Sequence, residues 1–219
     1  MRIRSDTHEH DEGTQRIEAF SDGVFAIAIT LLIIEIGVPT LTHDESLTDA
    51  LYDLWPKYFA YVLSFLIIGI YWANHHSFMR FFVRTDHYFL MLNVFFLMCI
   101  AFLPFPTAVL GEYLTEEAER KTAVAFYAFG LLLPAVSWML VWFYGNWDDL
   151  IDENLDPGYV RFLTAQYLAS SALYVASFFI AALWQPYVAL AIAVGLTLLY
   201  LLPPRSRRYR TPAAGDPFQ

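Results

Sequence analysis

The chain has 219 residues, of which 58% are hydrophobic and 16% are charged, and its formal net charge is −9. Soluble domains have about 45–50% apolar and about 25% charged residues, so this composition favours a membrane protein of one domain. The negative charge argues against nucleic-acid binding, which requires a clustered basic surface. Cys99 is the single cysteine, which excludes an intrachain disulfide or a thiolate metal cluster.

The apolar residues fall into long uncharged stretches, each suited to a membrane-spanning helix of about 20 residues. We therefore expect an all-α integral membrane protein with six transmembrane helices per subunit, at residues 20–38, 55–78, 88–110, 122–145, 159–183 and 186–202. Pro104 and Pro106 should bend or end the third helix. A cytoplasmic segment, 1–19, is expected before this domain of residues 20–202, and a basic cytoplasmic tail, 203–219, after it.

The distribution of lysine and arginine predicts the orientation, because these residues favour cytoplasmic loops. With the N-terminus inside, the inner segments contain Arg2, Arg4, Arg16, Arg80, Arg84, Arg161, Arg205, Arg207, Arg208 and Arg210. The outer segments contain only Lys57, Arg120 and Lys121. We therefore expect a multi-pass protein of the cell membrane with both termini in the cytoplasm.

The first span has polar residues near its ends. Ser21 or Asp22 is expected to cap the helix N-terminus, and Pro39 to stop the helix. Ionisable groups near membrane depth usually have a partner, so Asp22 is also expected to contact Arg16 or a histidine of the second span. Capping alone is the simpler alternative.

The middle of the first span carries branched apolar residues at i, i+4 and i+7, and these share one helical face: Ile27, Leu31 and Ile34. A lipid-facing or packing stripe would show the same pattern. Thr30 and Ser21 are expected near this face, although Thr30 can also bond its own backbone one turn earlier. Symmetric copies of Glu35 would form a carboxylate ring, a common way to concentrate cations at a pore mouth.

The second span ends with His75 and His76, and the third contains Asn93. Zinc motifs on helices separate their histidines by three or four residues, so we expect no metal site at an adjacent pair. A hydrogen-bonded histidine that anchors helices is favoured, and Asn93 should form an interhelical hydrogen bond. The sequence has no nucleophile elbow, phosphate loop, His-Glu-x-x-His motif or Gly-Tyr-Gly potassium filter, so no enzyme is predicted.

Three stretches carry a family resemblance. They are Arg16-x-x-x-Phe20-Ser21-Asp22, continuing as Gly23-Val24-Phe25-Ala26-Ile27-Ala28-Ile29-Thr30-Leu31-Leu32, then Asn74-His75-His76, and Leu103-Pro104-Phe105-Pro106-Thr107. They are similar to motifs of the lysosomal potassium channel family, also called the transmembrane protein 175 family, and most of all to its bacterial branch. The second half of the chain agrees with that family only in hydropathy and number of spans.

The resemblance implies a homotetramer in the lipid bilayer, whose first helices line a pore for monovalent cations. Potassium would be the permeant ion, without the usual carbonyl filter. We expect no cofactor, and from the physics of an apolar constriction we expect only modest selectivity over sodium. By position, the resemblance assigns hydrophobic constrictions to Ile27, Leu31 and Ile34, and a selectivity hydroxyl to Thr30. It assigns a cytoplasmic-end network to Arg16, Phe20, Ser21, Asp22, and His75 or His76. A narrow apolar ring favours the more weakly hydrated potassium ion and can gate by dewetting.

Two alternatives follow from the same polar residues. A proton-coupled transporter would use Asp22, His75 and His76 as a proton relay, and its flux would saturate. A membrane-embedded hydrolase would need Asp22, Glu35 and a histidine at one depth. The two carboxylates are 13 residues apart, which is about 20 Å along a helix, so one subunit cannot combine them.

Overall fold

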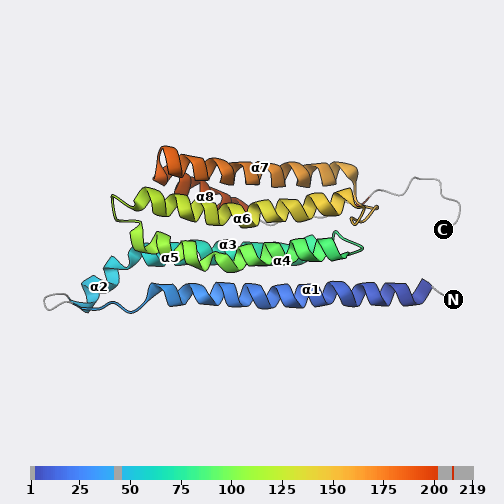
Figure 1. Cartoon of the computed structure of the whole chain (residues 1–219), viewed down its shortest axis with the longest axis horizontal. Coiled ribbons are helices and arrows are strands. Elements are labelled where there is room, and N and C mark those ends of the chain that lie inside the picture. The colour runs from blue at the N-terminus through green and yellow to red at the C-terminus, as the bar shows by residue number, and fades with distance from the viewer. Residues whose placement is uncertain (1–2, 42–45, 202–208, 210–219) are drawn as a thin grey trace.

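The structure is a computed structural model that describes residues 3–41, 46–201 and Tyr209. Its helices are α1 (Ile3–Leu31), the 3-10 helix η1 (Leu32–Ile36), α2 (Leu47–Asp53), α3 (Trp55–Met79), α4 (His87–Phe102), α5 (Pro104–Tyr113), α6 (Arg120–Trp147), α7 (Pro157–Leu183) and α8 (Pro186–Tyr200). The long helices run side by side as a bundle, with α1 along one edge and α7 along the opposite edge (Figure 1). The predicted tail, 203–219, lies outside the described residues except for Tyr209.

Five helical segments are long and apolar enough to cross a membrane: Arg16–Ile36, Trp55–Met79, His87–Tyr113, Arg120–Trp147 and Pro157–Leu183. The sixth expected span corresponds to α8, an apolar helix of 15 residues. At 1.5 Å per residue α8 is about 22 Å long, which is less than the hydrocarbon core of about 30 Å. The described residues therefore contain five full-length candidate spans and one shorter apolar helix.

The first span differs from the prediction at both ends. Ser21 and Asp22 lie in the middle of α1, so the prediction that one of them caps its N-terminus was wrong. A capping residue is no helix breaker, and the preceding stretch has no proline to stop the helix. At the other end, the helical segment stops at Ile36, and the next residue, Gly37, takes a positive φ of 64°, which glycine adopts at no steric cost.

The predicted break at the prolines of the third span is confirmed. Leu103 separates α4 from α5, and Pro104 begins the new helix because it lacks the N–H that would continue the old one. Next to this break, the Ser64 hydroxyl lies 2.7 Å from the Thr107 hydroxyl and 3.0 Å from the Tyr127 hydroxyl. This buried cluster joins α3, α5 and α6.

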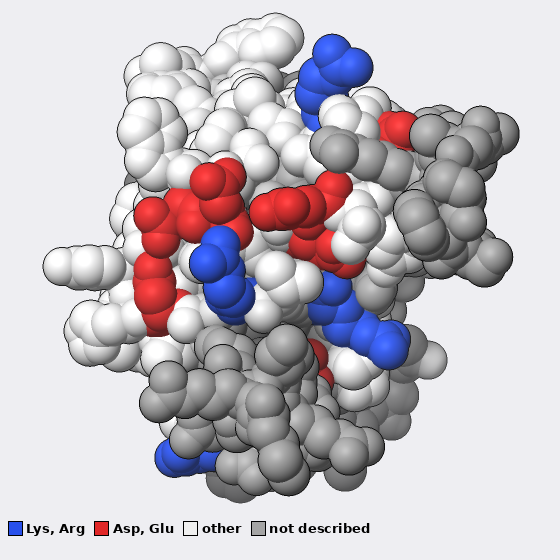
Figure 2. All heavy atoms as spheres, turned by 90° about the vertical axis from the view of Figure 1, so that its right-hand side faces the viewer, with Lys and Arg blue, Asp and Glu red and all other residues white. Residues whose placement is uncertain are grey.

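The turns that follow α3 and α6 lie at the same end of the bundle as the start of α1 (Figure 1). They are joined by backbone hydrogen bonds from Val83 N to Leu150 O and from Asp152 N to Phe81 O, both 2.9 Å. Figure 2 shows this end, where acidic side chains gather beside a smaller number of basic ones. The described charged residues of these turns are Arg80, Arg84, Asp86, Asp148, Asp149, Asp152, Glu153 and Asp156.

Candidate functional site

One face of α1 packs on the bundle. Ser21, Phe25, Ala28 and Leu32 are all at most 2% exposed and lie three or four residues apart, which places them on one side of the helix. This side packs against α3 and α4. Ser21 therefore lies on the buried face and not near Thr30, contrary to the expectation from the sequence.

The other face of α1 and η1 is open. Ile27, Leu31 and Ile34 are 62%, 42% and 69% exposed, and Phe20, two turns before Ile27, is 57% exposed. Glu35 follows in η1 and is also exposed. The bundle of one chain thus leaves the whole predicted apolar stripe uncovered, with a carboxylate near its end.

Thr30 lies on this exposed side and bonds its own helix. Its hydroxyl is 2.8 Å from the Ala26 carbonyl oxygen and 3.0 Å from that of Ile27, so Thr30 forms a hydrogen bond to the backbone one turn earlier. A hydroxyl that donates its proton to the backbone still has oxygen lone pairs to offer. The bond fixes the direction in which Thr30 can present them.

A buried polar chain attaches α1 to its neighbours. Asn93 on α4 donates from Nδ2 to the Ser21 hydroxyl at 3.3 Å, and its Oδ1 lies 3.0 Å from His75 Nε2 on α3. All three residues are at most 3% exposed. Because a carbonyl oxygen only accepts, His75 Nε2 is the donor, and Asn93 forms the predicted interhelical hydrogen bond.

Two further contacts link α1 to α3 nearer the surface. Trp72 Nε1 donates to Asp22 Oδ1 at 3.0 Å, and His76 Nδ1 lies 3.3 Å from Glu18 Oε2. Arg16 is exposed, and in the part of the chain that the structure describes it forms no ion pair with Asp22. Of the predicted network residues, Ser21 and His75 belong to the buried hydrogen-bond chain, and Asp22 and His76 belong to the two surface contacts. Arg16 and Phe20 are exposed and take part in neither.

Sequence reasoning missed Trp72 and Glu18 as partners. Glu18 and Asp22 are four residues apart, and so are Trp72 and His76, so each pair lies on one face of its helix. α1 and α3 run in opposite directions, which matches Glu18 with His76 and Asp22 with Trp72. This equal spacing was the available signal, but the register between the helices was not visible in the sequence.

Comparisons with known proteins identify the family. The model of the endosomal/lysosomal potassium channel TMEM175 matches residues 16–104. A potassium channel of Streptomyces collinus is 44% identical over 147 residues, which are 67% of this chain and 71% of that protein. The chain belongs to the TMEM175 family.

A solved structure agrees with this assignment. The crystal structure of a lysosomal potassium-selective channel TMEM175 homolog from Chamaesiphon minutus superposes with a TM-score of 0.78 at 37% identity, covering 87% of this chain and 97% of that one. With five apolar helices of spanning length, TMEM175 family membership makes this a multi-pass membrane protein. The matched region, 16–104, includes the parts of α1, α3 and α4 that carry the polar chain.

More distant members of the TMEM175 family carry a different name. An endosomal/lysosomal proton channel TMEM175 of Danio rerio is 38% identical over 114 residues, which are 48% of this chain and only 21% of that protein. Bacterial relatives are named potassium channels and vertebrate relatives proton channels. The family is thus one of cation channels, which is not an enzyme class.

The geometry does not assemble the proposed proton relay. Among the described residues, Asp22 has no hydrogen bond to His75 or His76, because the three bond separately to Trp72, Asn93 and Glu18. The His75 ring is enclosed by Phe25 and Phe96, with centroid distances of 5.6 and 5.9 Å. No group of three or more potential metal ligands occurs in the described residues.

Proposed function

We propose that this TMEM175 family member is a subunit of a leak-type cation channel that conducts potassium with modest selectivity over sodium. The observation that carries the proposal is the uncovered stripe of Ile27, Leu31 and Ile34 on α1. The opposite face of the same helix is held to α3 and α4 by the buried chain of Ser21 and its partners. α1 is therefore anchored on one side and available to other subunits on the other.

The proposal includes a homotetramer in the cell membrane, with cytoplasmic termini. One helix face cannot enclose a pore, whereas four copies of α1 around a common axis would do so. The exposed branched side chains would then be covered by one another. In the closed point groups that most homo-oligomers adopt, each subunit contributes the same face, which fits one exposed stripe per chain.

Conduction in this arrangement depends on rings of side chains. Ile27, Leu31 and Ile34 would form successive apolar constrictions. Potassium is more weakly hydrated than sodium, so it would lose less hydration free energy on passing them. Thr30 would present its hydroxyl oxygens beside the ring of Ile27. Glu35, one residue after Ile34, would raise the local concentration of cations at the pore mouth. No resident cofactor is needed for this mechanism.

Recording in a planar bilayer tests the function. Purified protein between a potassium solution and a sodium solution should give ohmic single-channel currents, with a reversal potential that shows a moderate preference for potassium. A saturable, proton-dependent flux without single-channel steps would instead support the proton-coupled transporter. Mass measurement in detergent should find four copies, and a strict monomer that still conducts would contradict the pore model.

A further inference from the structure

A second feature of the bundle lies away from the exposed face of α1. A partly open cavity of about 760 Å³ is lined by residues of α3, α6, α7 and α8. Its lining includes residues of α3 from Ile67 to Phe78, Phe81 just after α3, and residues of α7 from Tyr159 to Tyr174. α8 has only 15 residues and α7 has 27, so α8 covers only part of α7, and the last residues of α8, from Leu196 to Tyr200, line the cavity.

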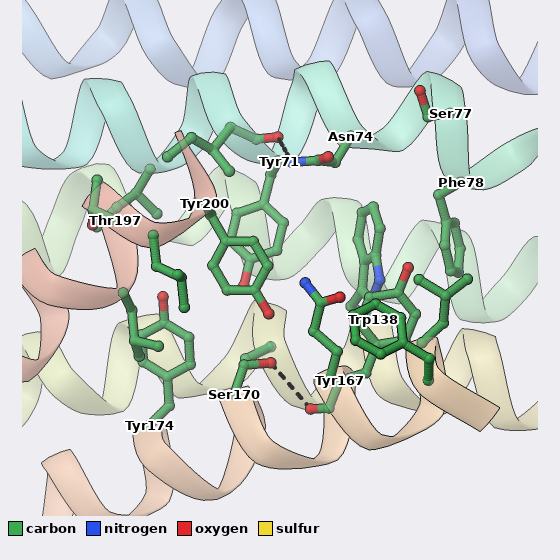
Figure 3. A pocket seen from close by; sticks show the side chains of 18 of the residues that line it. Tyr71, Asn74, Ser77, Phe78, Trp138, Tyr167, Ser170, Tyr174, Thr197 and Tyr200 are labelled. Atoms are coloured by element: carbon green, nitrogen blue, oxygen red, sulfur yellow. Dashed lines mark hydrogen bonds between the residues drawn. The ribbon is translucent and has the colours of Figure 1, made fainter. Parts of the chain in front are cut away.

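The described residues that line the cavity have no charged side chain. Its walls are flat aromatic rings, among them Tyr71, Trp138 and Tyr167, and Figure 3 shows the side chains of Tyr71, Tyr174 and Tyr200 entering the same space from α3, α7 and α8. Polar atoms are spread among these rings and not gathered at one point. They include the amides of Asn74 and Gln166 and the hydroxyls of Ser170 and Thr197.

Several of these polar groups have bonding capacity left. Asn74 donates to the Ile70 carbonyl, and Ser170 donates to the Tyr167 carbonyl, so each keeps an acceptor oxygen. Within the part of the chain that the structure describes, the hydroxyl groups of Tyr71 and Tyr200 form no hydrogen bond. The cavity therefore offers donors and acceptors on several sides.

We propose that this cavity binds an uncharged amphiphile with a flat ring system. Its volume is typical of sites for small organic ligands, which are about 300–1,000 Å³. A charged ligand would find no countercharge among the described lining residues and would be penalised for losing water. A bare acyl chain would leave the hydroxyls and amides unpaired. A rigid ring system with separated polar groups satisfies both the aromatic walls and the polar atoms.

The cavity is connected to the anchor of α1 through Trp138. The Trp138 ring forms part of the cavity wall, and its centroid lies 6.3 Å from that of His75 and 5.3 Å from that of Phe96. His75 holds α1 through Asn93 and Ser21. An occupant that moves Trp138 therefore acts on the packing behind the exposed face of α1. This regulatory step rests on the proposed channel function, whereas the binding site does not.

Photolabelling tests the site. The probe is a neutral steroid that carries a diazirine, applied to the protein in lipid nanodiscs, and labelled peptides are identified by mass spectrometry. We expect labels on the cavity-lining parts of α3 and α7. Ser170→Phe, which fills the cavity, should abolish them, whereas Ala172→Phe, at an exposed position of α7 outside the lining, should not. Tyr200→Phe, which keeps the ring, should weaken labelling roughly fivefold through one lost hydrogen bond.

Three results would overturn the site: equal labelling of wild type and Ser170→Phe, equal labelling by a sulfated anionic steroid, or labelling that appears only after removal of residues 202–219. The last result would make the chain's own tail the occupant. For regulation, the neutral steroid should change wild-type current in a planar bilayer but leave Ser170→Phe current unchanged. An unchanged wild-type current would overturn the coupling. If the wild-type protein carried no current at all, the proposed channel function would be contradicted. The photolabelling result would still show whether the cavity binds the steroid.

Discussion

Trp72 donates a hydrogen bond from its indole nitrogen to Asp22, across 3.0 Å between α3 and α1. The sequence had suggested Arg16 or a histidine as the partner of this carboxylate. A neutral donor changes the expectation for mutants, because removing the negative charge does not leave an opposite charge without a partner. For the stability of this contact, the Asp22 oxygen that accepts the hydrogen bond is therefore more important than the negative charge of the carboxylate.

We therefore expect Asp22→Asn to be tolerated, since an amide still offers an acceptor oxygen to Trp72. Asp22→Ala and Trp72→Phe should each lower the free energy of unfolding by roughly 1 kcal/mol, and the double variant should lose no more than either one. Thermal unfolding of the purified protein in detergent measures all four. If Asp22→Asn were as damaging as Asp22→Ala, the charge itself would be required, as in a contact with Arg16 of another subunit.

Asn93→Ala should be more harmful, because it leaves Ser21 and His75 without partners in a buried position. The expected loss is about 1–3 kcal/mol per unpaired buried group. Asn74→Ala is the matched control, since Asn74 is only partly buried and donates to the carbonyl of Ile70 in its own helix. The same melting experiment compares the two. If Asn93→Ala and Asn74→Ala lowered the stability equally, Asn93 would not be the residue that attaches α1 to α3 and α4.

Ile27→Asn tests the constriction. A polar side chain in a narrow apolar ring should admit water, raise the single-channel conductance and weaken discrimination against sodium. Ile33→Asn serves as control, because Ile33 is 52% exposed but belongs to a different face. Conductance and reversal potential are read in the bilayer assay. Unchanged values for Ile27→Asn would place this face of α1 outside the pore.

Thr30 provides a separate test of selectivity. Thr30→Val keeps the shape of the side chain but removes the oxygen, whereas Thr30→Ser keeps the oxygen that bonds to the Ala26 carbonyl. We expect the potassium-to-sodium permeability ratio to change in Thr30→Val and to remain near wild type in Thr30→Ser, with similar expression of both. A wild-type ratio in Thr30→Val would mean that the hydroxyl serves only its own helix.

Acid should destabilise the turn before α4 through Asp86. The backbone N–H of Phe89 and then the Tyr144 hydroxyl, at 2.8 and 2.6 Å, hold the pKa of Asp86 below its usual value. A carboxyl group with a lowered folded-state pKa stabilises the protein above its unfolded pKa of about 3.9, and this contribution is lost as the pH falls further.

Asp86→Asn keeps an acceptor for the Phe89 N–H but cannot titrate. Its melting temperature should therefore depend less on pH below about pH 4 than that of wild type. Tyr144→Phe should have an intermediate dependence, because the larger backbone contribution remains. Identical acid profiles of wild type and Asp86→Asn would show that other groups govern acid stability.

The sequence by itself determined the features that depend on neighbouring residues. Long uncharged stretches located the five full-length helices, because a bilayer-spanning helix must be apolar along its length. Pro104 located the break in the third span, because proline lacks the N–H that a helix needs. The motif around Ser21 and Asp22 pointed to the family, and hydropathy located α8 within two residues of its observed end at Tyr200.

Only the tertiary structure decided which side chains of α1, α3 and α4 form hydrogen bonds and ion pairs with one another. Adjacent histidines are equivalent in sequence, yet His75 is buried against Asn93 while His76 reaches Glu18 at the surface. The antiparallel register of α1 and α3 sets this choice and also matches Asp22 with Trp72. Register results from the packing of side chains far apart in the chain, so no local pattern encodes it. For the same reason only the folded bundle shows the cavity between α3, α6, α7 and the last residues of α8.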